Sequence, residues 1–149
     1  MTFLEHRIPP PVVALLLAAG MWWLARGWLG AGWPVWVSDG WRLALAGALV
    51  LTGGAFDVAG LVAFRAPRTT VNPLRPERSS ALVTGGVYRL TRNPMYVGMA
   101  CLLLAWAVYL GSLPVLTGPV LFVLYITRFQ IVPEERALRR LFGADYEAY

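Results

Sequence analysis

Long apolar runs separated by short polar segments dominate this chain. Residues 12–29, 43–64, 95–110 and 115–131 are almost wholly apolar. At a rise of about 1.5 Å per residue, the second run covers about 33 Å, close to the hydrocarbon thickness of a bilayer. The third run is shorter, so a polar flank must dip into the bilayer or the bilayer must thin around it. The pattern predicts an all-α membrane protein with four transmembrane helices.

The last two runs are separated only by Gly-Ser-Leu-Pro at 111–114. Glycine and proline interrupt a helix there, so we expect the third and fourth spans to form a helical hairpin. A hairpin returns the chain to the membrane face from which it started. The polar connection 65–92 and the C-terminal tail 134–149 are therefore expected to meet at one face.

The tail has the spacing of an amphipathic cytoplasmic helix. Pro133 interrupts the apolar pattern, and we expect the fourth span to break at this residue. A helix is expected from Glu134, and Gly143 fits its C-terminal stop. Its apolar face is expected to comprise Leu138, Leu141 and Phe142.

The composition agrees with a single integral membrane domain over residues 1–149. Hydrophobic residues make up 58% of the chain and charged residues 14%, outside the usual balance of soluble proteins. The net charge is +5, and every basic residue is an arginine. These arginines lie beside apolar spans, so the positive-inside rule explains them more simply than nucleic-acid binding does. We expect membrane lipids as partners, and neither nucleic acid nor an obligate protein.

The arginines also predict an orientation. Arg26 and Arg42 flank the first loop, whereas the other eleven of the 13 lie near the N-terminus, in 65–92, beside the end of the fourth run or in the tail. Four spans with both termini in the cytoplasm satisfy the positive-inside rule, and we expect a bacterial inner membrane. The N-terminal run lacks a small-residue cleavage site, so we expect an uncleaved first span.

Two residues inside the apolar runs need separate interpretation. An ionisable residue within a span, such as Asp57, is a candidate functional group by default. Asp57 also lies close enough to the end of its run for an ion pair with Arg65 or Arg68, and both interpretations stay open. The single cysteine, Cys101, cannot form an intrachain disulfide and is expected to be a small buried apolar residue.

The stretch 85–98, with the sequence GGVYRLTRNPMYVG, combines several binding groups. Asn93 and Pro94 predict a helix start, because asparagine favours the N-cap and proline the first helical position. The free N–H groups of such a first turn form a natural anion site. An ordinary interfacial start to a transmembrane helix has the same composition. The flanking cations and rings are Arg89, Arg92, Tyr88 and Tyr96.

Glu134 and Glu135 form the second group of interest. Two carboxylates in the first turn of a helix are stabilised by its dipole, which is the simplest interpretation. Together with the stretch 85–98 they meet the demands of S-adenosylmethionine, because a carboxylate binds ribose hydroxyls, a tyrosine ring stacks on adenine or faces a cation, and arginines hold a carboxylate. The same groups also suit a nucleotide.

The two motifs, LVTGGVYRLTRNPMYVG at 82–98 and EERALRRLFGADYEAY at 134–149, lie on either side of an apolar hairpin. In this order they resemble the isoprenylcysteine carboxyl methyltransferases and the phosphatidylethanolamine methyltransferases. The resemblance implies S-adenosylmethionine-dependent methyl transfer to a lipophilic or small acceptor (a carboxylate, thiol or amine) at the cytoplasmic face. It implies no metal.

The resemblance also implies which residues hold the cofactor, within the segments 80–96 and 134–149. Glu135 would support the glutamate before it. The implied lining residues are Ser80, Ala81, Leu82, Val83, Tyr88, Asn93, Pro94, Met95, Tyr96 and Glu134.

Two positions depart from the prenylcysteine enzymes. Those enzymes have histidine where this chain has Asn93, and a substrate-contacting arginine where it has Gln130. The nearest arginine is Arg128, which we expect to face the acceptor. No residue is assigned as a general base.

Two other functions fit the same layout. One is an NADPH-dependent membrane reductase similar to the sterol reductases, although four spans leave little room for a sterol and a dinucleotide. The other is a non-catalytic membrane protein on the same scaffold.

Overall fold

A computed structural model describes residues 8–27, 38–65 and 84–148. Within these ranges the regular secondary structure is helical and contains no strand. The long helices alternate with short 3-10 turns, labelled η2 and η3, and with a five-residue π-helix, labelled η4. In chain order the elements are α1 (Pro10–Gly27), α2 (Asp39–Arg65), η2 (Gly86–Arg89), α3 (Pro94–Leu110), η3 (Leu113–Leu116), α4 (Thr117–Ile126), η4 (Thr127–Ile131), α5 (Val132–Phe142) and α6 (Ala144–Ala148).

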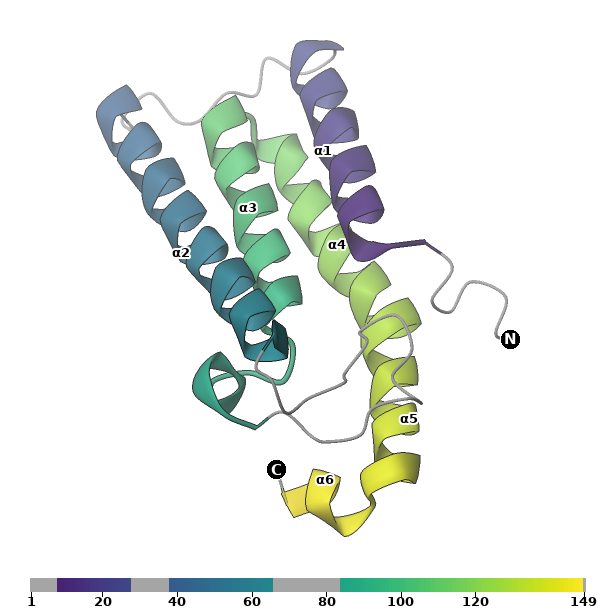
Figure 1. The fold of residues 1–149 in the computed structure, drawn as a ribbon. Helices are drawn as coiled ribbons and strands as arrows, with labels where there is room; N and C mark the ends of the chain where they lie inside the picture. Colours follow the sequence, from purple (N-terminus) through teal and green to yellow (C-terminus); the bar gives the residue numbers. More distant parts are fainter. Residues whose placement is uncertain (1–7, 28–37, 66–83, 149) are drawn as a thin grey trace.

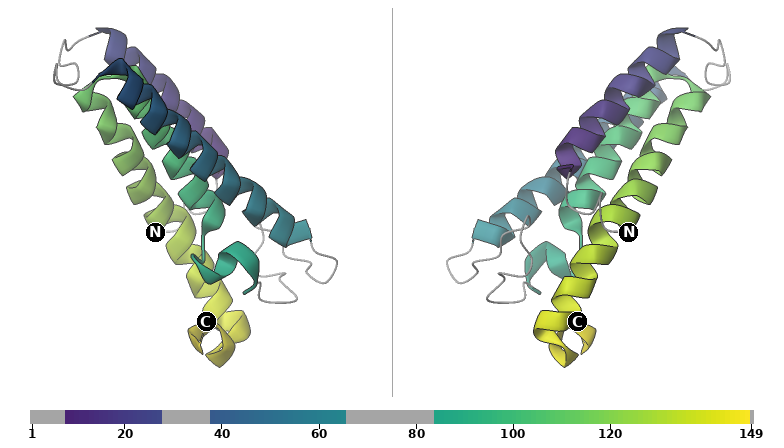
Figure 2. Two further views of the ribbon diagram at one scale, coloured as in Figure 1. Left: turned by 90° about the vertical axis from the view of Figure 1, so that its left-hand side faces the viewer. Right: turned by 90° about the vertical axis from the view of Figure 1, so that its right-hand side faces the viewer.

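Helix α3 is the centre of the bundle. It packs against α1, α2 and α4, whereas α2 packs on α3 and the neighbouring turn η2. Figure 1 shows α1 to α4 running side by side, with α5 extending below the bundle. Figure 2 shows that α4 and α5 form one continuous rod and that α6 turns back at its end. We call the end of the bundle with the start of α3 and with α5 the site end, and the opposite end the far end.

The predicted helical hairpin is present at the far end. Gly111 ends α3 in the left-handed conformation, with φ of 71°, which glycine adopts at little cost. Ser112 and η3 then lead directly into α4. The interruption at 111–114 is therefore where the sequence predicted it.

The expected break at Pro133 is wrong. The helix continues through the π-helix η4 and into α5, with Pro133 in the first turn of α5. Proline lacks an N–H and normally clashes with the carbonyl four residues earlier. The π turn before Pro133 shifts the backbone hydrogen bonds from i→i−4 to i→i−5. The helix therefore continues past Pro133 instead of ending. Gly143 does end α5, with φ of 49°, and the short helix α6 follows.

The apolar core lies between α1, α3 and α4. The Trp106 indole in α3 donates a hydrogen bond of 3.0 Å to the Ala18 carbonyl in α1. Helix α2 packs so closely on α3 that a Cβ on Gly53 would lie only 2.8 Å from the Gly98 carbonyl oxygen. Small residues allow such close helix contacts in membranes. The fully interior side chains are Val13, Met21, Leu103, Ala107, Val115, Phe122 and Ile126.

Two helices of the described chain are long and apolar enough to cross a membrane, Asp39–Ala63 and Leu113–Phe142. Two shorter helices, Pro10–Arg26 and Pro94–Leu110, are also apolar. Large apolar side chains point outward from the bundle, as lipid-facing residues do. Leu51 in α2 and Leu124 in α4 are examples, with 75% and 62% of their surface exposed.

Candidate functional site

The two sequence motifs meet at the site end through one hydrogen bond. The Tyr96 hydroxyl in α3 donates to Glu134 Oε1 in α5 over 2.6 Å, across 38 residues of chain. Both side chains are half-buried. This distance is at the short end of the range for O–H···O hydrogen bonds. The bond fixes the carboxylate of Glu134 relative to the start of α3.

The start of α3 differs in detail from the sequence prediction. Asn93 does precede the helix, but its side chain makes no capping hydrogen bond. The Tyr96 and Val97 N–H groups both donate to the Asn93 carbonyl over 3.1 Å. The Met95 nitrogen lies so close to α2 that a Cβ on Gly60 would be 3.7 Å from it. The expected row of free N–H groups is therefore reduced to the Met95 N–H, which faces α2.

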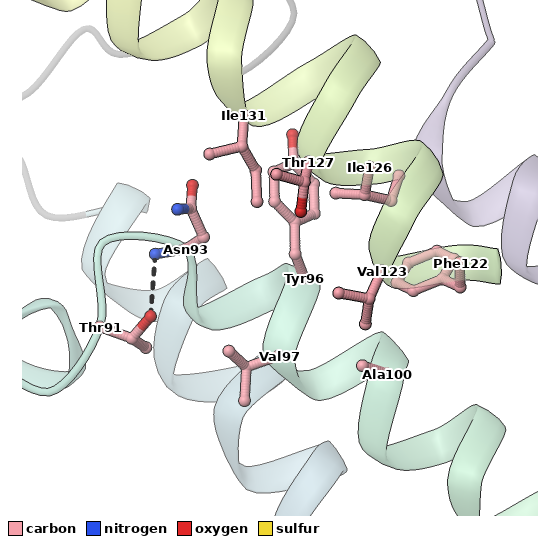
Figure 3. A pocket seen from close by; sticks show the side chains of 10 residues that line it. All are labelled: Thr91, Asn93, Tyr96, Val97, Ala100, Phe122, Val123, Ile126, Thr127 and Ile131. Atoms are coloured by element: carbon pink, nitrogen blue, oxygen red, sulfur yellow. Dashed lines mark hydrogen bonds between the residues drawn. The ribbon is translucent and has the colours of Figure 1, made fainter. Parts of the chain in front are cut away.

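A pocket of about 190 Å³ opens between α3 and α4 at this end. Figure 3 shows Tyr96 pointing from α3 toward the helix that carries Thr127 and Ile131, with Asn93 beside it. The polar groups gather near the start of α3, and the rest of the wall is apolar. The lining residues are Thr91, Asn93, Tyr96, Val97, Ala100, Phe122, Val123, Ile126, Thr127 and Ile131.

Sequence reasoning found only Asn93 and Tyr96 of this lining. Apart from Thr91, which precedes α3, the remaining residues lie along the facing sides of α3 and of the helix formed by α4 and η4. Their helical spacing is visible in the sequence, but it is shared by every buried helix face and marks no site by itself.

The other predicted cofactor residues have varied surroundings. Tyr88 is buried in η2, and Pro94 is buried at the start of α3. Met95 packs toward Gly60 of α2. Glu135 pairs with Arg139 one turn along α5, at 3.4 Å, and does not line the pocket. The predicted residues Ser80, Ala81, Leu82 and Val83 lie outside the described residues.

Arg128, the candidate for the acceptor, lies in the π-helix next to the pocket residue Thr127. Its side chain is exposed, and its guanidinium carbon lies 5.4 Å from the centre of the Phe129 ring. An exposed cation at this position attracts anionic headgroups at the membrane surface.

Helix α6 contacts Arg92 of the 65–92 connection at the site end; the sequence predicted that the tail and this connection meet there, but not this separate short helix. Tyr146 is only 2% exposed, and the Arg92 guanidinium lies 5.1 Å from the centre of its ring. Burial raises the pKa of the Tyr146 phenol, as does the nearby Glu135 carboxylate, whereas Arg92 and Arg139 act in the opposite direction. The contact joins the end of the chain to the motif before α3.

Asp57 lies on the opposite side of α3 from the pocket. Its Oδ1 is buried against Gly98 and has no hydrogen-bond partner. Arg68 and the Arg65 side chain, its expected partners, lie outside the described part of the chain. The ion-pair and functional interpretations of Asp57 are therefore not separated.

Comparison with known proteins now adds to this geometry. The sequence pattern of the phospholipid methyltransferases matches residues 41–145. A probable protein-S-isoprenylcysteine O-methyltransferase of Oryza sativa is 35% identical over 116 residues, covering 73% of this chain and 58% of that protein. Protein-S-isoprenylcysteine O-methyltransferase A of Arabidopsis thaliana is 33% identical over 107 residues, covering 68% of this chain and 51% of that protein.

An uncharacterized protein of Haemophilus influenzae is 40% identical over 55 residues, covering 37% of this chain and 87% of that protein. The chain thus spans a little over half the length of the two plant proteins. No solved structure matches. The match over 41–145 includes both motifs except the last residues of the second, and it confirms the resemblance. The chain belongs to the phospholipid methyltransferase family.

Proposed function

We propose that this chain is an S-adenosylmethionine-dependent methyltransferase that acts on a lipophilic or small acceptor at the cytoplasmic face of the membrane. The observation that carries the proposal is the hydrogen bond between Tyr96 and Glu134. It joins the two motifs of the family at the edge of a pocket that opens between helices.

The donor set at the site end fits this cofactor. Glu134 would accept hydrogen bonds from the ribose hydroxyls, and Tyr96 would hold its carboxylate in place. The Asn93 amide, which makes no capping bond, is available to the amino-acid end of the cofactor. The pocket of about 190 Å³ is smaller than the usual 300–1,000 Å³ of ligand sites. The proposal keeps Ser80, Ala81, Leu82 and Val83 as further cofactor-binding residues. Tyr88, Pro94 and Met95 would support this lining from behind.

The apolar part of the pocket suits the acceptor. Val97, Val123 and Ile126 form walls that an alkyl chain can contact, and entry between α3 and α4 avoids passage through water. Arg128 would face the acceptor's headgroup. The cofactor supplies a methyl group for in-line displacement, a reaction in which alignment of the reacting atoms provides much of the rate.

The proposal includes a topology of four spans with both termini in the cytoplasm and one domain over residues 1–149. It places the 65–92 connection, α5 and α6 on the cytoplasmic side of a bacterial inner membrane. Reporter fusions after Gly40 and after Tyr149 should report opposite sides of the membrane. A report of the same side from both would contradict this topology.

Binding measurements on the detergent-purified protein separate the candidate functions. Titration with S-adenosylmethionine should give saturable binding, and titration with NADPH should give none. Binding of NADPH alone would instead support a reductase, and binding of neither would support a non-catalytic protein. Both plant relatives described above are named as methyltransferases and not as reductases.

A further inference from the structure

The start of α1 leaves one carbonyl without a helical partner. Pro9, Pro10 and Pro11 carry no N–H, and the Val12 N–H donates to the Pro9 carbonyl over 2.9 Å. The Ile8 carbonyl, two residues before α1, therefore accepts no hydrogen bond from the first turn of the helix. Ile8 is half-buried, so its carbonyl is best satisfied by a donor from elsewhere in the protein.

Gln130 supplies that donor. Its Nε2 donates to the Ile8 carbonyl over 3.0 Å, across 122 residues of chain. Gln130 is 3% exposed and is one of two buried polar side chains in the described part of the chain. Its amide is thus used inside the protein and is turned away from the pocket, which its neighbour Ile131 lines.

Gln130 lies within the π-helix, so its hydrogen bond to Ile8 connects that helix to the start of α1. A π turn contains one extra residue, which changes the direction of all later side chains by about 100° relative to an unbroken α-helix. In an unbroken helix Pro133 would point where Glu134 now points, and Tyr96 would lose its acceptor. A π turn is less favourable than an α turn; Pro133, which lacks an N–H, removes part of that difference locally, and tertiary contacts can supply the rest.

We propose that Gln130 is a positioning residue, which holds the π turn through the Ile8 carbonyl and so directs Glu134 toward Tyr96 and the cofactor. This inference rests on the proposed function for its effect on the cofactor, but not for its effect on the helix. Gln130 touches neither the cofactor nor the acceptor. It acts through Glu134.

The first experiment requires no cofactor. Gln130→Met keeps the length of the side chain and removes the donor. Hydrogen exchange of the backbone amides of residues 127–135 should become faster in this variant. Trp106→Phe is the matched control, because it removes a 3.0 Å bond to the Ala18 carbonyl of the same helix α1. Equal exchange of 127–135 in wild type and Gln130→Met would overturn the proposal.

The second experiment is a double-mutant cycle on the affinity for S-adenosylmethionine. Gln130→Met should weaken binding roughly tenfold in the wild-type background, as expected for loss of one buried hydrogen bond, and much less in the Glu134→Gln background. An equal loss in both backgrounds would mean that Gln130 has only a structural role. A raised KM for the acceptor with unchanged cofactor affinity would place it at the acceptor instead and reject the proposal. Absence of cofactor binding by wild type would contradict the proposed function, while the exchange experiment still tests Gln130.

Discussion

The two ends of the helical bundle are built differently. At the far end α1, α3 and the hairpin close on apolar side chains, and Ala107 and Val115 have no exposed surface. At the site end polar groups from different helices pair at half-buried positions, as Tyr96 and Glu134 do. The π-helix, the pocket and the covering helix α6 all lie at this second end.

The far end of the bundle serves stability, and the site end serves binding. Tight apolar packing at the far end holds α1, α3 and α4 together, so the site end is free to keep a pocket and polar groups that packing alone would not favour. Changes at the far end should therefore act on stability, and changes at the site end on binding. Each prediction below tests this division.

The largest effect is expected from removal of residues 134–149. The shortened chain lacks Glu134 and the helix that covers the site end, so binding of S-adenosylmethionine should be lost. The bundle of α1 to α4 should still insert and keep its helical content by circular dichroism. Removal of residues 144–149 alone is the matched control and should weaken binding less. Normal binding by the longer deletion would place the cofactor elsewhere.

The fold could be predicted from the sequence further than the site could. Apolar runs of helical length, the turn at 111–114 and Gly143 all act locally, and the structure contains helices and stops at those places. The continuous helix through Pro133 was missed because the compensating π turn has no sequence signal of its own, and its buried Gln130 bonds to Ile8, which is far away in the chain. For the same reason the Tyr96–Glu134 bond and the Tyr146–Arg92 contact could not be read from either motif alone.

The next largest effect on binding is expected from Glu134→Gln. The amide is nearly the same size as the carboxylate, but it loses the charge that strengthens hydrogen bonds to hydroxyls. The free energy of S-adenosylmethionine binding should weaken by about 1.5–3 kcal/mol, which is roughly 10- to 100-fold in affinity, as measured by titration. Unchanged affinity would leave Glu134 with the helix-dipole role only.

Met21→Ala is the counterpart of this change at the far end. Met21 is buried in α1 and packs against Gly118 of α4. Its truncation should lower the free energy of unfolding by about 2 kcal/mol, the low end for such a cavity because lipid also solvates apolar groups, and leave cofactor affinity unchanged. A loss of affinity comparable to that of Glu134→Gln would contradict the division between the two ends.

A smaller effect is expected from Arg128→Ala. The side chain is exposed beside the pocket, so a headgroup contact there is screened by water and worth about 1 kcal/mol. The kcat/KM for the acceptor should fall roughly fivefold, whereas the affinity for S-adenosylmethionine should stay nearly the same. Arg140→Ala, an exposed arginine further along α5, is the control. Loss of cofactor binding by a folded Arg128→Ala protein would reject its assignment to the acceptor.

The smallest effect concerns the docking of α6 at alkaline pH. Burial, and then the Glu135 carboxylate, raise the pKa of Tyr146, so the folded protein holds the phenol proton at pH values where the unfolded chain releases it. The stabilising effect of the neutral phenol is therefore complete below the ordinary tyrosine pKa of about 10 and is lost as the pH rises through the higher pKa of the folded state.

Tyr146→Phe keeps the buried ring beside Arg92 but removes the ionisable group. The variant also loses the hydrogen bond between the Tyr146 hydroxyl and Arg92, so its melting temperature in detergent should lie slightly below that of the wild type up to about pH 10, and the difference should narrow or reverse at higher pH. Tyr109→Phe changes an exposed tyrosine in the half of α3 near the far end, and it should follow the wild type throughout. A Tyr146→Phe protein that lost stability equally at pH 8 and pH 11 would show that the hydroxyl acts only through its hydrogen bond with Arg92 and that ionisation of the phenol has no effect. The covering of the site end by α6 would then depend on that bond and not on burial of a neutral ring.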